Sequence, residues 1–221
     1  MVANRDKSVR RPRTNAALRR SHSAGFTLLE ALISMLIIAL GLLGLAGLQI
    51  RMQQAEFESY QRSQALILLH DMAERIQSQP VATKNCFALT TNTSDGTPYL
   101  GTGVTAPTGC TSGGTAADNT FADASIAEWH NLLRGAAETK SGTAVGAMIG
   151  ARGCVTYSTT SELPGLPGTG VYTVMVAWQG QSNTAAPTKV DGSTLGCANG
   201  LYGDERMRRV VYTTLRFARL N

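Results

Sequence analysis

Apolar positions follow three different patterns along the chain, and the first is a long run near the N-terminus. From Phe26 to Ile50 the sequence is almost continuously apolar, with Glu30 as its only ionisable residue. At about 1.5 Å per residue, a helix of this length crosses a hydrocarbon core of about 30 Å. No turn signal follows before Pro80, so the pattern predicts one continuous helix from Phe26 to Gln79.

The second pattern covers residues 51–79, where apolar residues recur every three or four positions. Most of the charged residues between them are placed to face water. This spacing predicts the amphipathic half of the same helix, with one face available for packing. The apolar positions are Phe57, Ala65, Leu69, Met72 and Ile76.

The third pattern is a strand period in the C-terminal third. The stretches RGCVTYST, GVYTVMVAWQG and RMRRVVYTTLRFARL are rich in β-branched and aromatic residues and are bounded by Gly, Pro and Asn. They predict a small, mainly antiparallel sheet with one apolar face, which includes Tyr172, Val174, Val176 and Trp178. The amphipathic helix offers the only long apolar stripe to cover that face, so the expected class is α+β, with the long helix packed on the sheet.

Between the long helix and these strands the sequence changes character twice. Residues 81–122 are rich in Thr, Gly, Ser, Asn and Pro, which predicts a long surface loop. Asp123 is then expected to cap a short helix that ends at Gly135 and has Trp129 on its apolar, core-facing side.

The net charge of +5 is concentrated at one end of the chain. Seven of the 20 Lys and Arg residues lie within residues 1–25, and the remainder of the chain is close to neutral, so we expect no direct nucleic-acid binding. A basic cluster before an apolar span predicts a cytoplasmic N-terminus and an exported C-terminal region.

All four cysteines, Cys86, Cys110, Cys154 and Cys197, follow the span. An even number on the exported side predicts two disulfides, and no pair has the C-x-x-C spacing of a zinc site. Three pairings are possible. We favour Cys86 with Cys110, which bracket the polar loop, and Cys154 with Cys197, which tie a strand to the segment before the last strand.

The sequence offers no enzymatic signature. After the basic segment only His70 and His130 remain, outside any metal-binding spacing, and we expect both to be ordinary helix residues. Neither a G-x-S-x-G nor a Walker motif occurs, and GLPGTG has the composition of a turn. We therefore expect no catalytic residues, no metal and no cofactor.

Glu30 and three glycines are the unusual features of the apolar run. A carboxylate within a span costs about 3 kcal/mol unless it reaches the headgroups or finds a partner. Gly41, Gly44 and Gly47 each weaken a helix by about 1 kcal/mol, either for close helix packing or to let the segment unwind in an assembly.

The stretch AGFTLLEAL after a basic leader resembles the class III signal of type IV prepilins and pseudopilins. The resemblance implies that residues 1–25 are removed by a prepilin peptidase between Gly25 and Phe26, and that the new amine of Phe26 is methylated. It also implies that Glu30 pairs in the filament with the Phe26 amine of a neighbouring subunit, because a buried charge is tolerated when it is matched. The span would be retained, unlike that of an ordinary secretory signal.

Several later stretches, among them RSQALILLHDMAERIQSQP, AEWHNLL, YTVMVAWQG and RRVVYTTLRF, are similar to PilV-type minor pilins. The resemblance implies a non-enzymatic minor subunit of a type IV pilus that acts in assembly initiation and near the tip. Its partners would be the prepilin peptidase, other minor pilins, the major pilin, a large tip adhesin, and membrane lipid before assembly. A minor pseudopilin of a type II secretion system is the main alternative, followed by a single-pass periplasmic binding protein with an uncut leader.

These expectations divide the chain into four parts. Residues 1–25 form the leader, 26–50 the transmembrane and filament-core helix, 51–79 its amphipathic periplasmic half, and 80–221 the globular pilin head. The expected location is the bacterial inner membrane in a single pass, with the C-terminal region in the periplasm, and later the cell-surface pilus.

Overall fold

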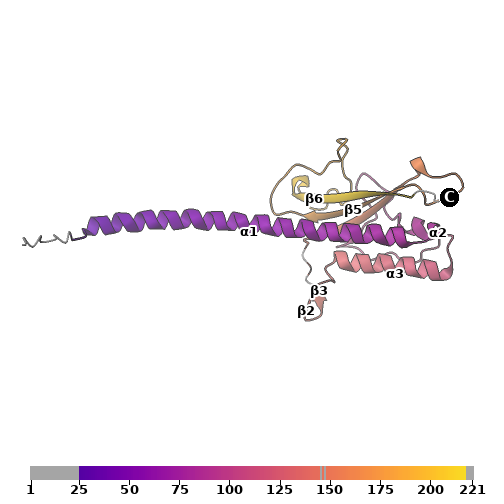
Figure 1. The fold of residues 1–221 in the computed structure, drawn as a ribbon, viewed down its shortest axis with the longest axis horizontal. Coiled ribbons are helices and arrows are strands. Elements are labelled where there is room, and N and C mark those ends of the chain that lie inside the picture. Colours follow the sequence, from indigo (N-terminus) through magenta and orange to yellow (C-terminus); the bar gives the residue numbers. More distant parts are fainter. Residues whose placement is uncertain (1–24, 145, 147, 218–221) are drawn as a thin grey trace, which may run out of the picture. The chain divides into compact units, whose positions relative to one another are not determined.

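The computed structural model describes residues 25–144, 146 and 148–217. Two compact units are present, one that ends at Leu48 and one that begins at Gln49. Helix α1 contributes to both units, and the other elements belong to the second (Figure 1). The elements are α1 (Leu28–Ser78), α2 (Val81–Lys84), η1 (Asn85–Phe87), β1 (Leu100–Gly101), α3 (Ala116–Leu133), β2 (Thr139–Lys140), β3 (Thr143–Ala144), β4 (Arg152–Ser158), η2 (Thr159–Ser161), β5 (Val171–Gln179), η3 (Glu205–Met207) and β6 (Arg208–Arg216).

Helix α1 is the single long helix that the sequence predicted, and it ends two residues before Pro80. Its last carbonyl groups are satisfied by a lysine that follows in the chain. The Lys84 ammonium donates to Ile76 O at 2.7 Å and to Gln77 O at 3.2 Å, and burial lowers the pKa of this lysine. A cation at this position also suits the negative end of the helix dipole.

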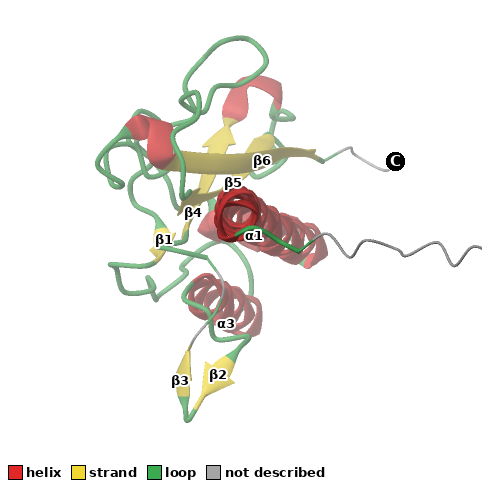
Figure 2. Ribbon diagram, turned by 90° about the vertical axis from the view of Figure 1, so that its left-hand side faces the viewer, coloured by secondary structure: helices red, strands yellow, loops and turns green. Residues whose placement is uncertain are grey.

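The three predicted strands are present as β4, β5 and β6, and they form an antiparallel sheet with the short strand β1 in the order β1-β4-β5-β6 (Figure 2). β5 is central and pairs along its full length with β6, from Val171 opposite Arg216 to Gln179 opposite Arg208. The expected α+β class is confirmed.

The main core lies where the second half of α1 and helix α3 meet one face of the sheet. Trp129 of α3 is fully buried there, and its indole N–H donates to Leu68 O of α1 at 2.8 Å. The expected apolar stripe of α1 is buried except for Phe57, which is only half-buried. The other large contributors to this core include Leu69, Met72, Ile76, Val155, Tyr172, Val174, Val176 and Trp178.

The opposite face of the sheet is also covered, which the sequence did not predict. Met175 and Ala177 of β5 are buried there beneath the connection between β5 and β6, together with Leu195, Cys197 and Tyr202. The expectation of a single apolar face was wrong, because alternating residues of a strand that is buried on both sides are apolar on both sides.

The polar region before α3 is more regular than predicted. The expected loop over residues 81–122 contains α2, β1 and the first residues of α3. Helix α3 begins at Ala116 because Thr115 and Asp118 form a capping box, so the expected cap at Asp123 was wrong. The end of the helix agrees with the prediction, since Gly135 follows it with a φ of +88°.

The connection between β5 and β6 is held near its second end by a buried arginine. Arg208 is fully buried, pairs with Glu205 at 2.6 Å and donates to the carbonyl groups of Leu195 and Cys197. Earlier in the same connection, a small turn between Thr188 and Thr194 places Val190 entirely in solvent.

Candidate functional site

The candidate processing and assembly site is the N-terminal end of α1. Gly25, Phe26 and Thr27 precede the helix in non-helical backbone, and all three are exposed. Phe26 is 79% exposed. The expected scissile bond between Gly25 and Phe26 therefore lies in a non-helical, accessible segment, which a peptidase can reach.

Glu30 occupies the first turn of α1, where its backbone is held by a threonine. Its N–H donates to the Thr27 hydroxyl oxygen at 3.2 Å, so Thr27 acts as the N-cap and Glu30 stands three residues after it. The Glu30 carboxylate is exposed and has no hydrogen bond or ion pair within the described residues. The T-x-x-E spacing of Thr27 and Glu30 is a local capping signal that is visible in the sequence but was not among the predictions.

The apolar half of α1 has no packing partner in the described chain. Every residue from 25 to 56 is exposed, and α1 is long and apolar enough to cross a membrane by length and composition. A Cβ added at Gly41, Gly44 or Gly47 would meet nothing within 4 Å. Contacts within the described residues therefore do not require these glycines, and both explanations for them remain.

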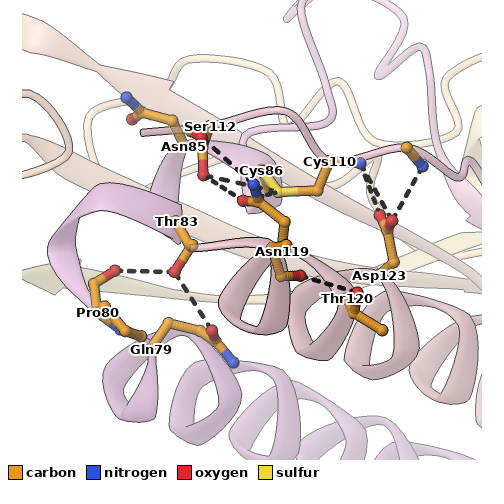
Figure 3. Close-up of a disulfide and its surroundings, with 12 residues drawn as sticks. Gln79, Pro80, Thr83, Asn85, Cys86, Cys110, Ser112, Asn119, Thr120 and Asp123 are labelled. Atoms are coloured by element: carbon orange, nitrogen blue, oxygen red, sulfur yellow. Dashed lines mark hydrogen bonds between the residues drawn. A yellow bond between two sulfur atoms is a disulfide. The ribbon is translucent and has the colours of Figure 1, made fainter. Parts of the chain in front are cut away.

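The four cysteines form two disulfides with the expected pairing, Cys86 with Cys110 and Cys154 with Cys197. The first joins the residues after α1 to the loop before α3 (Figure 3). Asp123, displaced from its expected capping role, accepts hydrogen bonds from the backbone N–H groups of Gly109 and Cys110 at 3.0 and 2.9 Å. The second disulfide joins β4 to the covering connection on the far face of the sheet.

The two histidines differ in environment, and neither has a catalytic partner among the residues that the structure describes. His70 is exposed, whereas His130 is buried and its Nδ1 accepts a hydrogen bond from the Gly101 N–H at 3.1 Å. Burial and, secondarily, the charge of Arg134 lower the pKa of His130 and favour the neutral ring that can accept this bond. No group of three or more His, Cys, Asp or Glu side chains suited to a metal ion occurs among residues 25–144, 146 and 148–217.

Two family models match successive parts of the chain. The prokaryotic N-terminal methylation motif matches residues 20–46, which contain Gly25, Phe26 and Glu30. The model of the type IV pilin Tt1218 matches residues 47–122, which contain the second half of α1 and the first disulfide. The chain belongs to the type IV pilin family. No curated protein and no solved structure matches this pilin.

Membership of the family gives the N-terminal site its general meaning. Type IV pilins are structural proteins, so this pilin is not an enzyme. The methylation motif implies processing by a peptidase and assembly with other pilins, and the motif and the long apolar helix together fit a membrane anchor that later enters a pilus.

Proposed function

We propose that this pilin is a minor subunit of a type IV pilus, similar to the PilV type, which acts in assembly initiation near the tip. The observation that supports this best is the arrangement of the N-terminal site. An accessible Gly25–Phe26 bond directly precedes a capped helix whose first turn carries a free carboxylate, Glu30. The partners in this proposal are other minor pilins, the major pilin and a large tip adhesin.

Processing by a prepilin peptidase would remove residues 1–25 and leave Phe26 as a methylated N-terminus. Thr27 is the only residue between that terminus and the first residue of α1, so the new amine would stand directly before the helix. Residues 26–50 would remain as the membrane and filament-core helix, with residues 51–79 as its periplasmic half and 80–221 as the head.

Glu30 has a separate role in this proposal, which is to pair with the Phe26 amine of a neighbouring subunit. Its backbone is already held by the Thr27 cap, so the carboxylate is free for a contact between subunits. In lipid, a lone carboxylate costs about 3 kcal/mol, and pairing in the filament would offset that cost.

The proposed membrane topology is supported by charge and cysteines together. The basic leader favours a cytoplasmic N-terminus in the bacterial inner membrane, and the two disulfides suit a head in the oxidising periplasm. Lipid is the first environment of the apolar helix, and the cell-surface pilus is its final one.

Mass spectrometry of the mature N-terminus and immunoblots of sheared pili test the proposal together. We expect an N-methylated Phe26 in the pilus fraction and a block in cleavage for Gly25→Val, with Gly41→Val as the control that leaves cleavage intact. An intact leader in mature pili would contradict processing. A processed chain found only in a type II secretion pseudopilus would favour the pseudopilin alternative.

A further inference from the structure

β6 is an outer strand of the sheet, and its outward edge is unpaired in the described part of the chain (Figure 2). The backbone bonds at its start show which groups are free. Gln179 N–H donates to Ile149 O, away from β6, whereas Gly180 N–H donates to Met207 O. Antiparallel pairs alternate in this way, so the backbone N–H and C=O groups of the odd-numbered residues of β6 bond to β5. The backbone groups of the even-numbered residues point away from the sheet. Those with both backbone groups free are Val210, Tyr212, Thr214 and Arg216.

The sequence of this edge favours pairing with another β-strand. Residues 210–215, VVYTTL, are uncharged, β-branched or aromatic except for the final leucine, and they are not interrupted by proline. Most of their side chains are only half-buried. A long uncharged open edge is a template for pairing with another strand, and proteins usually cover such an edge or break it with charge or proline.

A groove of about 410 Å³ runs beside the first half of this edge, between β6 and the helix segment Ala55–Arg62. Trp178, Val210 and Val211 are its apolar lining residues from the sheet. A strand added to β6 would project every second side chain over this groove. Main-chain pairing combined with a pocket for alternate side chains is how β-augmentation recognises an extended segment.

One wall of the groove is held in place by a carboxylate that accepts four hydrogen bonds. Glu58 accepts from Arg209, from the N–H groups of Gln181 and Ser182, and from the Ser182 hydroxyl, at 3.0 to 3.2 Å. Partial burial alone would raise the pKa of Glu58, but these bonds and the Arg209 charge outweigh it and hold the pKa below its usual value. The amphipathic pattern of residues 51–79 predicts that Glu58, like most charged residues of that segment, faces water, and the structure shows it bound to the loop after β5 instead.

The charges that remain free around the edge are positive. Arg62 lines the groove, Arg216 ends the strand, and neither forms an ion pair or hydrogen bond within the described residues. In full antiparallel overlap of two copies of β6, Arg216 of one copy would stand opposite Arg208 of the other and would meet no carboxylate, because β6 contains none, so the edge favours a strand of different sequence. The edge therefore suits a strand that carries carboxylates near its ends.

We propose that the free edge of β6 binds an extended segment of a different pilin subunit, with a small apolar side chain in the groove and carboxylates near Arg62 and Arg216. This docking rests on the proposed function, in which the chain assembles with other pilins. It would add a strand-to-strand contact between subunits to the contacts made by their α1 helices.

Hydrogen exchange resolved by residue tests this pairing on the full chain. In detergent, the purified chain should exchange the even-numbered amides of residues 210–216 rapidly and the odd-numbered ones slowly. In the assembled form, the even-numbered amides should slow by about 10-fold or more. Side-chain burial alone would not protect alternate amides. Equal exchange in both forms would overturn the proposal, and so would protection in the purified chain, which would indicate pairing with a second copy.

A proline variant with a matched control provides the second test. Thr214 is exposed and its N–H points outward, so Thr214→Pro removes a docking donor without removing a bond to β5. We expect its co-purification with other pilins to fall about fivefold, as for one net backbone hydrogen bond, while Thr214→Ala and the membrane level of both variants stay unchanged. Equal recovery of the two variants would overturn the proposal.

The two proposals fail in different ways. Wild-type chain in pili with an unprotected edge would refute docking and leave the minor-pilin role standing. The opposite result is a wild-type chain that is absent from pili but is recovered with other pilins from the membrane with its β6 amides protected. It would refute the minor-pilin role and leave the docking proposal standing.

Discussion

Gly153→Ala is the substitution for which the structure makes the firmest prediction in the head. Gly153 lies on β4 directly beneath the indole of Trp129, and an ideal Cβ there would stand 2.1 Å from Cη2 and 2.3 Å from Cζ3 of that ring. It would also stand 2.7 Å from Cδ1 of Leu133. Since carbon atoms in contact prefer about 3.5 to 4.0 Å, the new methyl group would overlap the ring by more than about 1 Å.

Trp129 cannot move away at low cost. It is fully buried, and its N–H is held by Leu68 O of α1. Overpacking of this kind costs about 1–3 kcal/mol, and loss of the buried hydrogen bond would add about 1–3 kcal/mol. We therefore expect Gly153→Ala to lower the free energy of unfolding of the head by about 3 kcal/mol or more.

Pulse proteolysis in urea on the full chain in detergent measures this difference. Gly113→Ala is the matched control, because a Cβ at Gly113 meets nothing within 4 Å, and it should change the free energy of unfolding by less than about 0.5 kcal/mol. In a Trp129→Phe background the added cost of Gly153→Ala should fall by more than half. A cost below about 1 kcal/mol, or the same cost in both backgrounds, would refute the steric argument.

The remaining predictions concern protonation, the second disulfide and the assembly carboxylate. Burial holds the pKa of His130 below its usual value, so the unfolded chain takes up a proton first as the pH falls below about 6.5, and the free energy of unfolding should decline by at most about 1.4 kcal/mol per pH unit. Urea unfolding at pH 7.5 and 5.5 should show that His130→Gln removes this pH-dependent loss of unfolding free energy and that His70→Gln does not. The same pH dependence in both variants would contradict the assignment to His130. Replacing Cys154 and Cys197 together by serine should lower the free energy of unfolding by about 4 kcal/mol in the same assay, and a loss under 1 kcal/mol would show that the covering connection stays closed without its bridge. Glu30→Gln should be inserted, cleaved and as stable as the wild type, whereas its share in sheared pili relative to membranes should fall on immunoblots; an equal share would mean that Glu30 serves only its own helix end or the headgroups.

Helix α1 and the three long strands were predictable because the information that specifies them is local. An apolar run, a helical period and Pro80 define the helix, and alternation in β-branched stretches defines the strands. The buried Trp129 followed in the same way from its place on the apolar side of a short helix. The N-terminal methylation motif was recognisable because its residues are adjacent in sequence, from Gly25 to Glu30.

What could not be predicted depends on residues that are distant in sequence. The start of α3 was obscured because Thr115 and Asp118 lie in a polar stretch whose composition resembles a loop. Asp123 serves a backbone turn at Gly109, a contact that no local pattern encodes. The free edge of β6 likewise follows from strand order, which the sequence of β6 alone does not specify.

The small turn that carries Val190 offers a practical handle for imaging. Lys189 N–H donates to Ser193 O, Gly192 N–H donates to Lys189 O, and the Asp191 carboxylate accepts from Ser193, so the turn closes on itself. With Val190 fully exposed, a cysteine-free peptide epitope inserted there would project into solvent and leave the buried core and the two bridges unchanged. A rare subunit could then be located on individual fibres by antibody-gold electron microscopy while its N-terminal processing segment keeps its native sequence.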